Sequence, residues 1–438
     1  MSIRESEEIE SETQPTVEHD APRSERSRIA LLVAVVAGVV ALSLVTGHGA
    51  LALVIACLIV MIMVHELGHL LAAKHGKMQV TEYFLGFGPR LWSIRRGETE
   101  YGIKAVPLGG YVKIPGMTNL DEVDPDIEAR TYRAQPFHAR LLVAVAGSAM
   151  HFLMAFVLLW VLLVFVGHPD ATRTSIQQVS ALNGQPGPAQ VAGLRAGDVV
   201  VSADGHRVGA DPGALVAAIR SHPGAPVTLV VDRSGNTRTI IVTPTNGRSV
   251  HEAGASPPSG DAPFGIIGVS LGSPTVRTGP LAAVPQVGTD LARFSWASVV
   301  GVGHLFSPSA TVARFSQITS AQAADQAAAN GTRVQSIVGA VQTAQDAAHA
   351  GLAELLLVLI SINLFVGIFN LFPMLPLDGG HVAIAAYERL RSIGRRTPYH
   401  ADVAKLMPFT WLMVGFLGIL FATSLATDVL HPMANPFG

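Results

Sequence analysis

The chain has 438 residues, of which 49% are hydrophobic and 14% charged, and its formal net charge is −2 at pH 7. This apolar balance is unusual for a soluble protein and indicates a membrane protein with soluble parts. The near-neutral charge implies no nucleic-acid partner, and the single cysteine, Cys57, excludes a disulfide within the chain.

The N-terminal part predicts a disordered tail followed by two membrane crossings. Residues 1–27 are polar, with an acidic start that does not resemble a signal peptide. The apolar run 29–71 would be about 60 Å long as a single helix, roughly twice the hydrocarbon thickness. Residues 46–49 interrupt it, so we expect two helices joined by a tight turn. Arginines just before the run place the N-terminus in the cytoplasm by the positive-inside rule.

The second of these helices carries the sequence His65-Glu66-Leu67-Gly68-His69. Residues four apart lie on one face of a helix, so His65 and His69 can bind the same metal ion. Glu66 occupies the position of a general base beside a metal-activated water. Ionisable groups at the end of an apolar helix are costly in lipid and are functional by default.

The polar and basic segment 74–140 has the charge expected of a cytoplasmic region. Residues 90–94 and 101–106 predict strands around a turn at 96–98, and 108–114 predict a further turn and strand. An extended peptide could pair with the edge of such a sheet. The alternative is a loop that only caps the helices, and these residues favour neither interpretation.

A third crossing is predicted at 141–166, with a small-residue face suited to close helix packing. It contains His151, which remains a candidate for a role near a metal. Beyond it, residues 170–245 predict a soluble domain, with strands at 227–232 and 238–242 and a helix at 214–220.

The segment that follows is harder to interpret. A Gly/Ser/Pro-rich linker spans 251–263, and 264–271 could be a strand. The amphipathic stretch 281–306 could lie on the outer membrane surface. Residues 321–329 are rich in Ala and Gln and could be helical or disordered.

A fourth crossing, 352–372, leads into a segment with two prolines and two glycines that contains Asp378. The crossing runs inward, so Asp378 is expected at the same depth as His65 and His69. The last crossing is predicted at 408–425. A catalytic zinc has three protein ligands and one open position, and we expect Asp378 to be the third. Glu66 would accept a proton from the zinc-activated water and pass it to the leaving amine during peptide hydrolysis.

Several motifs together resemble the site-2 protease family of intramembrane zinc metalloproteases, in particular the actinobacterial branch with a single PDZ domain. The resemblance covers about residues 50–430 and rests on five motifs and on a PDZ-like segment at 187–205: His65-Glu66-Leu67-Gly68-His69, Phe87-Gly88-Pro89, Gly97-Glu98-Thr99-Glu100-Tyr101-Gly102, Val106-Pro107-Leu108-Gly109-Gly110-Tyr111 and Leu377-Asp378-Gly379-Gly380-His381.

The resemblance implies a Zn²⁺ cofactor held by His65, His69 and Asp378, with Glu66 as catalytic base. It also implies that the strands around 106–114, including Gly109, Gly110 and Tyr111, present the substrate, and that Asn370 helps to position it. Its PDZ-like domain would lie outside the cytoplasm and admit only substrates that a first protease has trimmed.

Two features depart from the family pattern. The family's second core helix usually carries Gly-Pro-x-x-Asn, whereas this chain reads Gly147-Ser148-Ala149-Met150-His151. His151 therefore replaces an Asn and is a candidate second-shell residue of the metal site. The helix at 28–48 is additional to the common core.

The predicted fold is therefore a multi-span α-helical membrane protein of about five transmembrane helices, with a cytoplasmic β-loop region and an inserted extracytoplasmic PDZ-like α+β domain. The predicted parts are a tail (1–27), an additional transmembrane helix (28–48), the zinc-motif helix (49–73), the β-loop region (74–140), a transmembrane helix (141–167), the PDZ-like domain (170–247), a linker and membrane-surface segment (248–350), the helix with the Leu-Asp-Gly motif (351–381) and a last transmembrane helix (406–428).

We expect a multi-pass protein of the bacterial plasma membrane that cleaves single-span membrane proteins such as anti-sigma factors or remnant signal peptides. The lipid bilayer and a peptide or protein ligand of the PDZ-like domain are its other expected partners. The alternative functions are a non-catalytic scaffold whose PDZ-like domain captures chain ends, and a metal transporter. The transporter is disfavoured because the membrane segments show no internal repeat.

Overall fold

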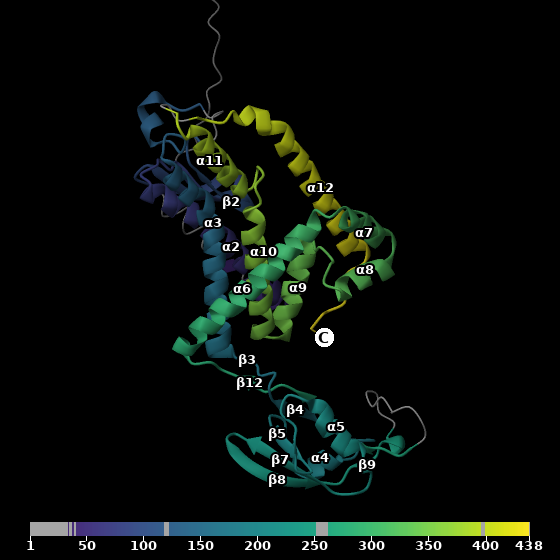
Figure 1. Cartoon of the computed structure of the whole chain (residues 1–438). Helices are drawn as coiled ribbons and strands as arrows, with labels where there is room; N and C mark the ends of the chain where they lie inside the picture. Colours follow the sequence, from purple (N-terminus) through teal and green to yellow (C-terminus); the bar gives the residue numbers. More distant parts are fainter. Residues whose placement is uncertain are drawn as a thin grey trace, which may run out of the picture. The chain divides into compact units, whose positions relative to one another are not determined.

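We describe the protein from a computed structural model of the chain (Figure 1), which covers residues 34, 37–38, 41–117, 122–250, 262–395 and 399–437. Contacts divide the chain into two units, each described here by itself. Unit 1 comprises Met1–His151, Arg314–Gln345 and Phe369–Met433, and unit 2 comprises Phe152–Ala313, Asp346–Ile368 and Ala434–Gly438.

The described residues contain four helices that are long and apolar enough to cross a membrane, so the chain is a multi-span membrane protein. They span Gly49–His75, Phe137–Val166, Leu352–Asn370 and Val403–Leu430. Of the predicted additional helix at 28–48, residues 41–45 are helical and most of the remainder lies outside the described residues. The predicted tail, 1–27, lies outside them entirely.

In unit 1, helix α2 (Gly49–His75) carries the predicted metal motif. It has no acidic residue in its first turn, and Lys74 and His75 occupy its last turn. These basic side chains suit the negative end of the helix dipole. Gly76 follows; its N–H donates to the carbonyl of Ala72, and the N–H of Lys77 donates to the carbonyl of Lys74, which ends the helix.

Strands β1 (Glu82–Arg96) and β2 (Thr99–Lys113) follow α2 and form a sheet of their own. Both strands bend, so that 82–85 pair with 100–103 and also with 110–113, while 92–96 pair with 99–103. The predicted turn at 96–98 and the predicted separate strand around 108–114 are thus parts of one folded hairpin. The segment 110–113 forms an outer edge of this sheet.

The remaining elements of unit 1 are η1 (Pro125–Arg130), the first part of α3 (Phe137–Val161), the second half of α7 (Pro308–Thr319), α8 (Ala321–Ala329), the first part of α9 (Ile337–Ala350), α11 (Asp378–Ser392), η4 (Val403–Leu406) and α12 (Met407–Leu430). A buried ion pair between Arg333 and Asp428 joins the segment after α8 to the end of α12, with an N···O distance of 3.0 Å. The N–H of Ser336 also donates to Asp428, at 2.7 Å.

Unit 2 contains a sheet domain, the teal body in Figure 1. Its sheet has the order β11-β4-β5-β7-β8, with β6 paired to β5. The strands and helices are β3 (His168–Pro169), β4 (Thr174–Val179), α4 (Pro188–Val191), β5 (Val199–Ala203), β6 (His206–Arg207), α5 (Pro212–Arg220), β7 (Val227–Arg233), β8 (Asn236–Val242), β9 (Thr245–Asn246), η3 (Gly247–Ser249), β10 (Gly265–Ile266), β11 (Val269–Gly272) and β12 (Thr275–Val276). The predicted strands at 227–232 and 238–242 and the predicted helix at 214–220 are confirmed.

A buried ion pair ties the start of β5 to the end of β7 in this domain. Nε of Arg233 lies 2.6 Å from Oδ1 of Asp198, and the backbone N–H of Arg195 donates to Oδ2 at 2.9 Å. Burial alone would raise the pKa of Asp198, but these hydrogen bonds and the charge of Arg233 outweigh it, so the pKa lies below its ordinary value. The Asp198 side chain is therefore a charged, fully paired part of the domain interior.

Residues 248–350 differ most from expectation, because they are not mainly linker. The predicted linker, 251–263, lies almost entirely outside the described residues, but β11 then pairs with β4 and extends the sheet domain to about residue 276. Four helices follow, including α6 (Pro280–Leu305). The amphipathic stretch 281–306 is a helix, and residues 321–329, for which helix and disorder were both open, are helical; α7 and α9 were not predicted. Strand pairing across about 90 residues leaves no local sequence pattern.

In the membrane part of unit 2, α3 continues into a π-helical turn, η2 (Leu162–Val166), and packs with α6 and α10 (Leu352–Asn370). Leu159, Ile360 and Leu364 are almost fully buried in this cluster. The buried polar residue Asn363 satisfies its amide by donating to the carbonyl of Leu359 at 2.8 Å.

Candidate metal centre

The two histidines of α2 and the first residue of α11 converge in unit 1. The Nε2 atoms of His65 and His69 lie 3.3 Å apart. Oδ2 of Asp378 lies 3.4 Å from Nε2 of His65 and 3.3 Å from Nε2 of His69. These side chains form the metal-ligand cluster found among the described residues, so residues more than 300 positions apart in the sequence meet at one point.

The spacing of these three atoms suits zinc. In a tetrahedron with metal–ligand bonds of about 2.1 Å, neighbouring ligand atoms lie about 3.4 Å apart. The three measured separations, 3.3, 3.3 and 3.4 Å, match three edges of such a tetrahedron. Two imidazole nitrogens and one carboxylate oxygen are a common donor set for zinc, and they leave the fourth position for water or substrate.

A contact outside the triad fixes the ring of His69. Its Nδ1 lies 2.8 Å from the backbone carbonyl of Val143 on α3, and a carbonyl can only accept. A neutral His69 therefore carries its proton on Nδ1, which leaves the lone pair of Nε2 available for a metal ion. A hydrogen bond of this kind typically orients a metal-binding histidine.

Helix α3 approaches the two histidines so closely that one position has no room for a side chain. A Cβ added at Gly147 would overlap the rings of both His65 and His69. At this point, glycine lets the backbone of α3 form one wall of the metal centre.

His151, one turn after Gly147 on α3, is 3% exposed. Its ring centroid lies 5.0 Å from that of His65, with the planes tilted by 44°. The structure thus places His151 beside a candidate metal ligand, although it is not a member of the ligand cluster found among the described residues.

The side chain of Glu66 on α2 lies against the outer edge of the β1–β2 sheet. The backbone of Val112 lies near its carboxylate, and a Cβ added at Gly110 would lie 3.2 Å from its Cγ. The OH of Tyr83 donates to the carbonyl of Met63 at 2.7 Å, which further ties the sheet to α2. The structure therefore brings the predicted base and the predicted substrate-presenting strand together.

Gly109 and Tyr111 flank that contact. Gly109 has φ +136°, a conformation that favours glycine. The Tyr111 ring stacks on Phe84 and Phe87 with centroid distances of 5.9 Å, and its OH accepts from Nζ of Lys104 at 2.6 Å. Asn370 is the half-buried last residue of α10, and its predicted role stays a prediction.

Two features that sequence reasoning missed hold Asp378 in place. A Cβ at Gly379 or Gly380 would collide with the turn 371–375, so the start of α11 lies tightly against that turn. Further along α11, Glu388 pairs with Arg140 of α3, and both side chains are buried. Glu388 also accepts from the N–H of Ala401 at 2.7 Å. In the sequence, this pair is visible only as two opposite charges at distant positions. That signal does not show that the two side chains meet.

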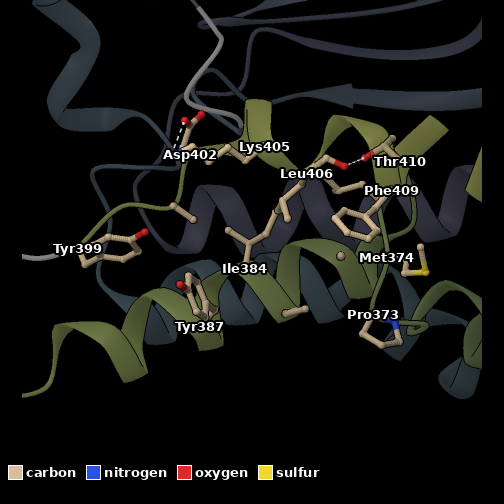
Figure 2. A pocket seen from close by; sticks show the side chains of 14 residues that line it. Pro373, Met374, Ile384, Tyr387, Tyr399, Asp402, Lys405, Leu406, Phe409 and Thr410 are labelled. Carbon is tan, nitrogen blue, oxygen red and sulfur yellow. Dashed lines mark hydrogen bonds and ion pairs between the residues drawn. The ribbon is translucent and has the colours of Figure 1, made fainter. Parts of the chain in front are cut away.

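An apolar cavity of about 510 Å³ lies on another side of α11, between Pro373, Ile384 of α11 and Phe409 of α12. Figure 2 shows these side chains around the cavity, with Tyr387 and Tyr399 at one end. None of the three metal-binding side chains lines it. The cavity is therefore separate from the metal centre.

Comparison with known proteins gives the family. The model for peptidase family M50 matches residues 53–414. The chain belongs to peptidase family M50, the site-2 protease family. Within the M50 family it is a zinc metalloprotease, and the His65–His69–Asp378 cluster is its candidate zinc site.

Curated relatives match over nearly their whole length. The zinc metalloprotease Rip1 of Mycobacterium tuberculosis strain H37Rv is 33% identical over 413 residues, which cover 89% of this chain and 98% of the relative. Rip1 of Mycolicibacterium smegmatis is 31% identical over 406 residues, covering 86% and 96%. The metalloprotease MmpA of Caulobacter vibrioides is 28% identical over 385 residues, covering 83% and 91%.

Proposed function

We propose that this M50 protein is an intramembrane endopeptidase that cleaves the transmembrane segments of single-span membrane proteins. The observation that carries the proposal is the triangle of His65, His69 and Asp378 with Glu66 beside it. His65, Glu66 and His69 lie on a helix that can cross a membrane, so the reaction centre is within reach of a membrane-embedded substrate.

Each of these side chains has a separate role in the proposed peptide hydrolysis. Zinc, when bound by His65, His69 and Asp378, supplies Lewis-acid activation of water and of the scissile carbonyl. Glu66 accepts the proton of the attacking water and delivers it to the leaving amine. The backbone of Val112 lies near the Glu66 carboxylate, and the Val143 carbonyl holds the His69 ring.

The outer edge of the β1–β2 sheet supports a route for presenting the substrate. A peptide bond is accessible to a protease only when its chain is extended, and an extended peptide can add to the edge of a sheet through backbone hydrogen bonds. The segment 110–113 is such an edge, and Gly110 lies against Glu66. Gly109, Gly110 and Tyr111 thereby position the substrate, with Asn370 as a further contact and His151 as a residue behind the His65 ligand.

The sheet domain of unit 2 serves in this proposal as a PDZ-like filter outside the cytoplasm, which binds a peptide or chain end. Its six-stranded sheet with α4 and α5 fits a small peptide-binding α+β module. The N-terminus is then cytoplasmic, and the membrane is the bacterial plasma membrane. Anti-sigma factors and remnant signal peptides are the substrates that fit a filter of this kind.

The decisive experiment combines cleavage and metal content for the purified full-length protein in proteoliposomes. With a single-span membrane protein as substrate, Glu66→Gln is expected to retain about one zinc per chain and to lose cleavage by at least a factor of about 10². The control is Glu122→Gln, which makes the same chemical change at an exposed position. Asp378→Ala is expected to lose the zinc, because two ligands remain.

Two results would contradict the proposal. Cleavage by Glu66→Gln at the wild-type rate would remove Glu66 from the mechanism. If the wild-type protein contained no zinc and its sheet domain still bound peptides, the scaffold function would be favoured.

A further inference from the structure

The structure also contains a hollow rich in positive charge next to the end of α2. The hollow has a volume of about 480 Å³, and its charged lining residues come from four segments of unit 1: Lys74, Lys77, Arg96, Glu98 and Arg130. Met78 also lines it and is 1% exposed. The proposed peptidase mechanism uses none of these side chains.

The charges in the hollow are not balanced. Glu98, its one carboxylate, pairs with Arg130 at 2.8 Å. Lys74 donates to the OH of Tyr101 at 2.7 Å, which is a neutral partner. Lys77 and Arg96 are exposed and form no ion pair within the described part of the chain. Three positive charges therefore face one space, and bringing like charges together is unfavourable unless an anion is bound between them.

The backbone holds these groups together. The N–H of Gln79 donates to the carbonyl of Arg130 at 2.9 Å, so the end of η1 lies against the residues that follow α2. Lys77 has φ 57°, a left-handed conformation that is uncommon for lysine. The helix dipole explains a lysine at position 74, but it does not explain the basic residues contributed by the end of β1 (Arg96) and by η1 (Arg130).

The position of the hollow indicates the source of the anion. Lys74 and His75 end the candidate span Gly49–His75, so the hollow lies at the depth of lipid headgroups. Leu71 is 54% exposed and stands three residues before Lys74, on the same helix face. A phospholipid could therefore place its acyl chain along Leu71 and its phosphate among the basic residues.

We propose that this hollow is a binding site for the headgroup phosphate of an anionic phospholipid. The bound phosphate, which carries one negative charge, lies among Lys74, Lys77 and Arg96, reduces their mutual repulsion and links the end of α2 to the β1–β2 sheet. Basic pockets beside transmembrane helices hold anionic headgroups in this way.

The test measures lipid retention by the purified full-length protein in phosphatidylcholine nanodiscs that contain increasing fractions of phosphatidylglycerol, using native mass spectrometry. The Lys77→Gln/Arg96→Gln double variant is expected to retain phosphatidylglycerol about 30-fold more weakly, because each basic group near the surface contributes about 1 kcal/mol. The charge-matched control, Arg95→Gln/Lys113→Gln, removes two positive charges from the same sheet outside the hollow and is expected to change retention little.

Retention by Lys77→Gln/Arg96→Gln at the wild-type level would overturn the proposal. An equal loss in the control pair would also overturn it, since net charge alone would then explain the binding. If millimolar inorganic phosphate binds the wild type and displaces the lipid completely, the hollow is a site for a soluble anion and the lipid assignment is wrong. The readout is binding, so it does not depend on peptidase activity.

Discussion

At the scale of single residues, the metal centre depends as much on a missing side chain as on its ligands. Gly147 lets α3 lie against the imidazoles of His65 and His69, and the carbonyl of Val143 on the same helix fixes one of them. A metal site tolerates displacements of only a few tenths of an ångström. The geometry of the centre is therefore sensitive to any atom added on this face of α3.

We expect Gly147→Ala to disrupt the metal centre while the protein stays folded. The new methyl group overlaps both histidine rings, so at least one ring must move. Zinc affinity should fall at least about tenfold and kcat/KM about 10²-fold. Competition with a chelator measures the affinity, and cleavage in proteoliposomes measures the rate.

Gly418→Ala is the matched control, because a Cβ at this position in α12 meets no atom within 4 Å. If Gly147→Ala and Gly418→Ala both bound zinc as tightly as the wild type, the close approach of α3 would not matter for metal binding.

At the scale of elements, two helices that contribute to the metal centre are joined by one buried ion pair. Arg140 lies on α3, and Glu388 lies on α11, which begins with Asp378. The OH of Tyr132 also donates to the carbonyl of Arg140, at 3.2 Å. The pair thus fixes the helix that supplies the third ligand against the helix that orients His69.

Glu388→Ala is expected to lower the free energy of unfolding by about 3–5 kcal/mol, because it leaves the Arg140 guanidinium buried without its partner. The double variant Arg140→Met/Glu388→Met should be much closer to the wild type, since it buries no charge. Denaturant unfolding of the detergent-purified protein, followed by pulse proteolysis, measures all three. If the double variant were as unstable as the sum of its single changes, the two residues would act independently and the ion pair would not be the link.

At the scale of the whole molecule, the sheet domain is an insertion whose two ends lie side by side. Pro169 of β3 pairs with Thr275 of β12, and His168 pairs with Val276. Paired residues on antiparallel strands lie about 5 Å apart at Cα. A short linker can therefore replace the intervening residues without stretching the chain on either side.

Replacing residues 170–274 with a short Gly/Ser linker should leave about one zinc per chain, because His65, His69 and Asp378 all lie outside the insertion. If the domain is a filter, the shortened protein should cleave full-length and trimmed substrates at equal rates, whereas the intact protein should prefer the trimmed one. Elemental analysis and cleavage in proteoliposomes give the two readouts. If the shortened protein bound zinc and still preferred the trimmed substrate, another part of the chain would select the substrate.

Much of this protein follows from short stretches of sequence. Apolar runs of membrane-spanning length predict the described crossings, because lipid forces each segment to satisfy its backbone hydrogen bonds internally. Alternation and turn residues predict β7 and β8 in the same local way. The spacing of His65, Glu66 and His69 is a property of one helix, so the sequence determines that they share a region of α2.

The tertiary structure decided what joins distant segments. It brought Asp378 within 3.4 Å of both histidines, placed Gly110 against Glu66, and paired Arg140 with Glu388. It also showed that β11 completes a sheet begun by β4. Local sequence reports propensity and periodicity over about ten residues. A contact between α2 and α11 depends instead on how all the intervening helices pack, and no local pattern records that packing.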